Sequence, residues 1–221
     1  FGTPNRINLY AGAMLAADPG VSDRDIYLRF LRSENWLKDG LTPEETGEAA
    51  RWFGRLMGRT WEATRRMLYV QGCVFSDSSL MPVSFAHAFW LAEEKNSLKA
   101  WDPSKADALA PDREHLEAAL AEKKEAVERV TALCALSGEP PAGIRPEKAG
   151  ELARRFGIHC EYAEMYAAAV SALMLTRYVR ETEEDRNSEY YRAICWKRRQ
   201  AVEALADWEI RLRRMAVETD Y

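Results

Sequence analysis

The sequence of 221 residues has few of the residues that metal sites and nucleophilic active sites require. It holds three histidines and four cysteines, and the cysteines lie far apart without a C-x-x-C pair. It contains neither the Glu-x-x-His pair of di-iron helical bundles nor a Gly-x-Ser-x-Gly turn. We therefore expect no metal site, no cofactor and no catalytic residue within this chain.

The sequence also lacks a long apolar run and an excess of basic charge. No stretch approaches the roughly 20 apolar residues that a membrane-spanning helix needs, so we predict no membrane partner. With 31 basic and 35 acidic residues the net charge is −4, which provides no positive field to attract nucleic acid. Single cysteines within helical patterns usually stay free thiols, and this favours a reducing, cytoplasmic compartment.

Helical periodicity is abundant. Apolar residues recur every three or four positions in seven segments, and no strand-like alternation is found. These segments are 4–17, 23–36, 42–70, 82–91, 112–136, 146–182 and 189–217. The pattern predicts an all-α fold, an antiparallel bundle of about six to seven helices. We expect one domain over residues 1–221, with 138–146 as the place where a subdomain boundary would fall.

The segment 42–70 has the clearest helix start. Thr42 and Glu45 form a capping-box pattern around Pro43, which suits the first helical position. We expect Trp52 and Trp61 to widen its apolar face. A second stripe of the same helix carries four arginines: Arg51, Arg55, Arg59 and Arg66.

The arginine stripe has two interpretations. Because acidic residues outnumber basic ones, we expect these guanidinium groups to pair with acids of neighbouring helices while their stems cover apolar surface. Alternatively, the stripe binds the carboxylates of an acidic sugar or of a partner protein, since a guanidinium group binds a carboxylate through two parallel hydrogen bonds.

The later helices are predicted from their apolar columns. The stripe of 112–136 includes Leu116, Leu120, Lys123 and Val127. The segment 189–217 has a seven-residue repeat that contains Trp208, so it should pack antiparallel on 146–182 with Trp208 buried and its indole N–H bonded. Aromatic residues at element ends suit a cleft rim or an interdomain surface instead: Trp36, Phe75, Trp90 and Trp101.

Residues Asn5–Pro19 read NRINLYAGAMLAADP, and Val21-Ser22 and a helix with Ile26 and Phe30 follow. This segment resembles a stretch of bacterial glycoside hydrolases of the α-glucuronidase type. In that family a similar stretch forms the last helix of a TIM-barrel catalytic domain. It leads into a C-terminal helical domain of about this length, which packs on the barrel and supports dimers. The resemblance implies that the catalytic carboxylates lie on barrel strands upstream of Phe1.

The leading hypothesis is a non-catalytic helical accessory domain of a larger carbohydrate-active enzyme, of which this chain, starting at Phe1, is a piece. It would pack on an upstream catalytic barrel and form homodimers. The alternative is a self-contained helical domain that binds another protein, and a third hypothesis is a small helical enzyme. The predicted ligand or interdomain surface consists of Phe75, Trp90, Trp101, Arg51, Arg55, Arg59 and Arg66.

Overall fold

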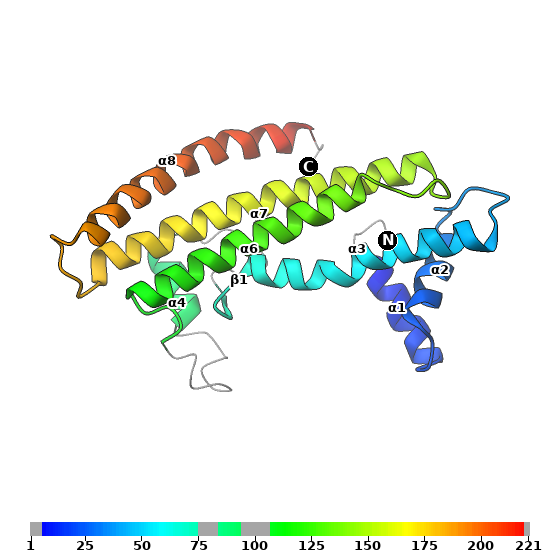
Figure 1. Cartoon of the computed structure of the whole chain (residues 1–221), viewed down its shortest axis with the longest axis horizontal. Helices are drawn as coiled ribbons and strands as arrows, with labels where there is room; N and C mark the ends of the chain where they lie inside the picture. The colour runs from blue at the N-terminus through cyan, green and yellow to red at the C-terminus, as the bar shows by residue number, and fades with distance from the viewer. Residues whose placement is uncertain (1–5, 75–83, 94–106, 219–221) are drawn as a thin grey trace. The chain divides into compact units, whose positions relative to one another are not determined.

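The computed structural model describes residues 6–74, 84–93 and 107–218. Within these residues there are seven α-helices, each within a few residues of a predicted segment (Figure 1). They are α1 (Arg6–Ala17), α2 (Asp23–Ser33), α3 (Pro43–Leu68), α4 (Phe85–Glu93), α6 (Arg113–Ser137), α7 (Pro146–Glu181) and α8 (Glu189–Glu218). The predicted all-α helical bundle is confirmed.

A small hairpin follows α3, where the sequence predicted no strand. Strands β1 (Tyr69–Val70) and β2 (Cys73–Val74) pair antiparallel. Gln71 and Gly72 join them with φ angles of 49° and 84°, the left-handed conformation that two-residue hairpin turns require. Strands of two residues are too short to show alternation, and α3 consequently ends at Leu68 rather than near Val70.

The described chain forms two compact units. Unit 1 is drawn from residues 1–61 and 131–158, and unit 2 from residues 62–130 and 159–221. Helices α3, α6 and α7 therefore each contribute residues to both units.

Aromatic side chains form the core of unit 1. The buried rings of Phe30 and Phe53 stack with their centroids 5.7 Å apart, and Trp36 meets Phe53 edge-on at 5.4 Å. Trp52 is also buried, and its Nε1 donates to the Leu136 carbonyl at 2.9 Å.

Trp61 lies outside this core, and its predicted burial is wrong. Its side chain is 67% exposed, whereas Trp52 is 1% exposed. The two residues are nine positions apart, which places them on opposite faces of a helix with 3.6 residues per turn. Only Trp52 shares the face of the buried Phe53 and Leu56.

The segment before α3 is tied to the segment before α7 within unit 1. The Lys38 N–H donates to the Gly143 carbonyl at 3.0 Å, and the Arg145 N–H donates to the Trp36 carbonyl at 2.8 Å. The predicted capping box then starts α3, since Thr42 N donates to Glu45 at 2.8 Å and Glu45 N donates to Thr42 Oγ1 at 3.3 Å.

In unit 2, α8 returns antiparallel along α7, as predicted (Figure 1). Near its start the Tyr191 hydroxyl donates to the Val179 carbonyl at 3.1 Å. Near its far end Arg211 lies 3.5 Å from Glu161 and 3.7 Å from Glu164.

Trp208 is buried on α8, as its seven-residue column predicted. It is 8% exposed, and the Arg211 guanidinium lies 3.7 Å above its ring. In the described part of the chain its indole N–H has no hydrogen-bond acceptor, contrary to the prediction. Its contribution therefore comes from apolar contact and from the stacked cation.

Candidate functional site

The arginine stripe of α3 divides between two environments. Arg66, in unit 2, is half-buried and pairs with Glu62 at 3.3 Å and with Glu125 at 2.8 Å. The other three are exposed in unit 1, with no ion pair to any residue that the structure describes: Arg51, Arg55 and Arg59. The predicted pairing with acids is therefore confirmed for Arg66 and wrong for these three.

The three exposed arginines form an outward row at intervals of four residues. This interval places successive guanidinium groups on one side of the helix. Glu48 lies on the same exposed side but makes no ion pair with them, as expected where an exposed pair gains little over hydration. The row is a basic strip whose hydrogen-bond donors are open to a ligand.

Of the aromatic candidates, the structure describes Trp36 and Trp90. Trp90, on α4 of unit 2, is 41% exposed, with its ring 6.0 Å from that of His87. Phe75 and Trp101 lie outside the described residues. Trp36 is half-buried, and its ring meets that of Phe53 edge-on in unit 1.

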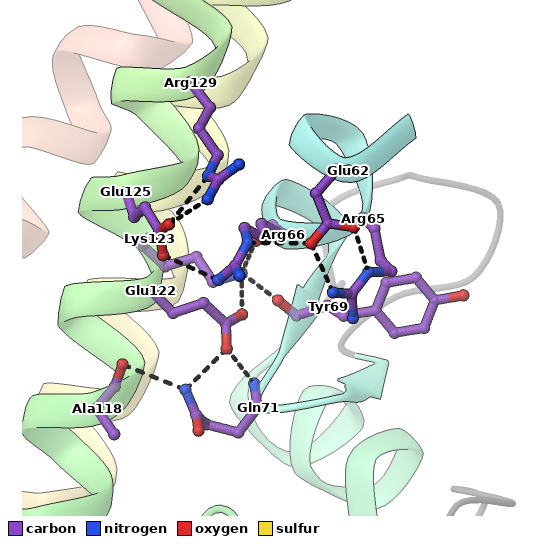
Figure 2. Close-up of polar contacts among 10 residues, drawn as sticks. All are labelled: Glu62, Arg65, Arg66, Tyr69, Gln71, Ala118, Glu122, Lys123, Glu125 and Arg129. Carbon is purple, nitrogen blue, oxygen red and sulfur yellow. Dashed lines mark hydrogen bonds and ion pairs between the residues drawn. The ribbon is translucent and has the colours of Figure 1, made fainter. Parts of the chain in front are cut away.

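A buried lysine is the polar centre of unit 2 (Figure 2). Lys123 on α6 is 1% exposed. Its Nζ donates to the backbone carbonyls of Arg66, Met67 and Tyr69, with the Met67 bond at 3.2 Å. The Glu122 carboxylate lies 3.0 Å from the same nitrogen. Four acceptors thus surround a group that has three hydrogens to donate.

The position of Lys123 follows from the end of α3. The last four carbonyls of a helix have no partner within that helix, and they carry the negative end of its dipole. An ammonium group from α6 supplies the missing donors, so it acts as a C-terminal cap delivered from another helix. Burial lowers the pKa of Lys123, while the charge of Glu122 opposes this shift.

Glu122 also holds the turn of the β1–β2 hairpin. Its Oε2 accepts from the Gln71 backbone N–H at 3.0 Å and from Gln71 Nε2 at 2.7 Å. Gln71 Nε2 also donates to the Ala118 carbonyl at 3.2 Å. Gln71 has a positive φ that non-glycine residues seldom adopt, and these three bonds on α6 stabilise it there.

A chain of ion pairs borders this cluster, as Figure 2 shows. Arg65 binds Glu62 through two hydrogen bonds of 2.8 and 3.2 Å. Glu62 also forms an ion pair with Arg66, and Glu125 forms ion pairs with both Arg66 and Arg129. Each acid is shared by two arginines, and the Arg66–Glu125 pair ties about one turn of α3 to about one turn of α6.

The Lys123 cluster stabilises the fold and is unsuited to catalysis. A lysine that acts as a nucleophile or base needs a free lone pair and access to a substrate. The ammonium of Lys123 has more acceptors than hydrogens and almost no exposure. The sequence offered one signal of this role, since a lysine occupied the predicted apolar stripe of 112–136.

A second polar cluster closes the corner between α7 and α8. The Tyr178 hydroxyl donates to Glu184, and Arg113 binds the same carboxylate at 2.6 Å. Arg113 also lies 3.8 Å above the ring of Tyr190, whose hydroxyl donates to Glu117 at 3.0 Å. Burial and the bond to Glu184 raise the pKa of Tyr178 to about 12. These phenols remain protonated donors and are poor bases.

An apolar groove of about 310 Å³ lies within unit 2. It is lined by Ser84, Phe85, Ala169, Ala172, Leu173, Thr176, Val202 and Leu205. Its polar side chains are two hydroxyls, so it contains no converging acid, base or charged group. The groove can receive an apolar side chain, but it holds no catalytic constellation.

The histidines and acids do not converge on a metal site in the part of the chain that the structure describes. No three metal-ligating side chains there come together. His159 is partly buried on α7, and burial lowers its pKa. His115 lies 2.7 Å from Asp112, its own helix cap.

Among the described helices, none combines the length and apolar character of a membrane span. Comparisons of the chain with family models, with curated proteins and with solved structures found no match.

Proposed function

We propose that this chain is a non-catalytic helical accessory module that packs on another folded domain through α1. The observation that carries the proposal is the exposure of an apolar helix. Arg6 is the one charged residue of α1, and no residue of the helix is buried. Leu9 is 61% exposed and Leu15 is 44% exposed.

One side of α1 packs on the rest of unit 1. Tyr10 meets the Phe30 ring edge-on at 5.5 Å, and Arg6 pairs with Glu34 at 2.7 Å. The outer side carries alanines, a glycine and the two leucines. A helix that faces water normally has a charged outer face, and an uncharged apolar one indicates contact with a partner.

The resemblance to α-glucuronidase-type glycoside hydrolases falls on this same helix and on α2. It supports a catalytic barrel as the partner of α1 and a role for the chain as an accessory part of a carbohydrate-active enzyme. The coding sequence that precedes the codon for Phe1 provides the first test. A frame that encodes alternating strands and helices supports the proposal, and a start codon there contradicts it.

Binding to the separately produced barrel provides the second test. Leu9→Glu with Leu15→Glu should weaken the complex more than tenfold, since buried charges replace apolar contacts at the interface. The matched control is Val202→Glu with Ile210→Glu on α8, where the parent side chains are 47% and 54% exposed. An equal loss in both variants would show that α1 is not the contact surface.

A second candidate function is a protein-interaction domain that uses the arginine row. Three guanidinium groups without carboxylate partners favour an acidic partner surface: Arg51, Arg55 and Arg59. Polyglutamate binding, measured at several salt concentrations, is the test. Reversing these three charges should abolish binding, while reversing the exposed charges of Lys197, Arg198 and Arg199 on α8 should spare it. Equal losses would contradict a localised surface.

A further inference from the structure

Two arginines from different helices converge on one glycine of α3. A β-carbon built onto Gly47 would lie 3.3 Å from Arg24 Nη2 and 3.4 Å from Arg51 Nη1. Gly47 itself is buried, whereas both arginines are exposed. The missing side chain at position 47 thus lets a guanidinium from α2 and one from α3 reach the same spot on the surface of unit 1.

Two acids close to Arg24 and Gly47 in the sequence accept hydrogen bonds within helix caps. The Asp25 carboxylate accepts from the Ser22 hydroxyl at 2.7 Å, and Glu45 accepts from Thr42 in the capping box at 2.8 Å. In the described part of unit 1, neither Arg24 nor Arg51 forms an ion pair. Two like charges held close together without a counter-charge repel each other, and an anion between them removes that repulsion.

We propose that Arg24 and Arg51 form a binding site for a phosphate group over Gly47. Two guanidinium groups offer several N–H donors in fixed planes, and a phosphate monoester has three terminal oxygens and close to two negative charges. A single carboxylate has two oxygens and one charge, so it satisfies this pair less completely. The site uses neither α1 nor the apolar outer face, so it stands or falls separately from the accessory-domain proposal.

Titration with inorganic phosphate at constant ionic strength tests the site. The Nε–H signals of Arg24 and Arg51 in ¹H–¹⁵N spectra should shift along one shared saturation curve, and that of Arg59 should not. Arg24→Gln and Arg51→Gln should each weaken binding about tenfold or more, the value of one charge-assisted hydrogen bond. Arg59→Gln, an exposed arginine of the same row, is the matched control and should change the Kd less than about twofold.

Gly47→Ala separates binding from folding. The added β-carbon meets both guanidinium groups, so phosphate affinity should fall, while alanine favours the helix more than glycine does. Phosphoserine distinguishes the source of the group: affinity above that of free phosphate indicates a phosphorylated side chain, and equal affinity indicates a free phosphate ligand. Absence of saturation, equal losses in Arg59→Gln, or tighter binding of succinate than of phosphate would overturn the proposal.

Discussion

Lys123 shows how one side chain can stabilise the end of a helix that is distant in sequence. It lies more than fifty residues after the carbonyls that it binds, and it replaces backbone donors that a capping motif would otherwise supply. Burying an ammonium group costs free energy, which only a complete set of acceptors offsets. The backbone carbonyls and Glu122 provide that set.

Lys123→Met should destabilise the protein strongly. The thioether fills much of the same volume but donates nothing, so the carbonyls of α3 and the Glu122 carboxylate lose their partner inside unit 2. Breaking a buried ion pair in this way costs about 3–5 kcal/mol of unfolding free energy. Urea denaturation measures the loss. Lys124→Met, at a neighbouring position whose side chain is 80% exposed, should change it by less than about 0.5 kcal/mol. Equal midpoints for the two variants would contradict the capping role.

Tyr178 should make the fold sensitive to alkaline pH. Its pKa rises from 10.0 to about 12 on folding because of burial and its bond to Glu184. Between these values the folded state keeps a proton that the unfolded state has lost, so stability is complete below pH 10 and falls as pH approaches 12. Urea midpoints measured across this range should fall, and Tyr178→Phe should make the fall less steep. A pH dependence that Tyr178→Phe leaves unchanged would contradict this role of Tyr178.

At the scale of elements, α8 carries two tryptophans in opposite environments. Trp208 is 8% exposed and lies beneath Arg211, whereas Trp196 is 59% exposed. They are twelve residues apart, a separation that turns the second side chain about 120° from the first on an α-helix. The same residue type on the same helix therefore serves as a core residue at one position and as a surface residue at the other.

Replacing each tryptophan by alanine measures this difference. Trp208→Ala removes a large buried side chain and leaves a cavity, which should cost about 3–5 kcal/mol. Trp196→Ala should cost less than about 1 kcal/mol because little apolar surface returns to water. Thermal unfolding followed by circular dichroism would report both. A Trp196→Ala variant that melts well below Trp208→Ala would reverse the assignment of α8 faces.

Helix positions and most inward faces were predictable because they depend on local spacing. The buried Ala49, Phe53 and Leu56 recur at intervals that only a helix brings together. Partners across the fold were not predictable, because a sequence pattern shows which residues share a face and not what that face meets. The ion pair of Arg66 with Glu125, the cap made by Lys123 and the meeting of Arg24 with Arg51 all join different helices.

At the scale of the whole molecule, the apolar groove of unit 2 brings no acid–base pair together. The apolar groove of unit 2 contains only hydroxyls as polar side chains, and the polar clusters use their carboxylates for arginine, lysine and tyrosine partners. A glycosidase needs one carboxylate to protonate the leaving oxygen and a second to act as base or nucleophile.

The purified chain should therefore hydrolyse no aryl glycoside or glucuronide. Release of nitrophenol from a panel of such substrates is the measurement. Turnover that a single carboxylate substitution abolishes would contradict the non-catalytic proposal, whereas turnover unaffected by every such substitution would point to a contaminating enzyme.

The interleaving of the two units has a consequence for synthesis on the ribosome. The first stretch of unit 1 ends at residue 61, and its second stretch begins at residue 131. At the usual 5–20 residues per second, roughly 4–15 seconds pass between the synthesis of residue 61 and that of Leu136, which accepts from Trp52. During that interval the apolar side of α3 around Trp52 lacks its partner residues from 131–158, so chaperones that bind emerging hydrophobic segments should meet this chain early.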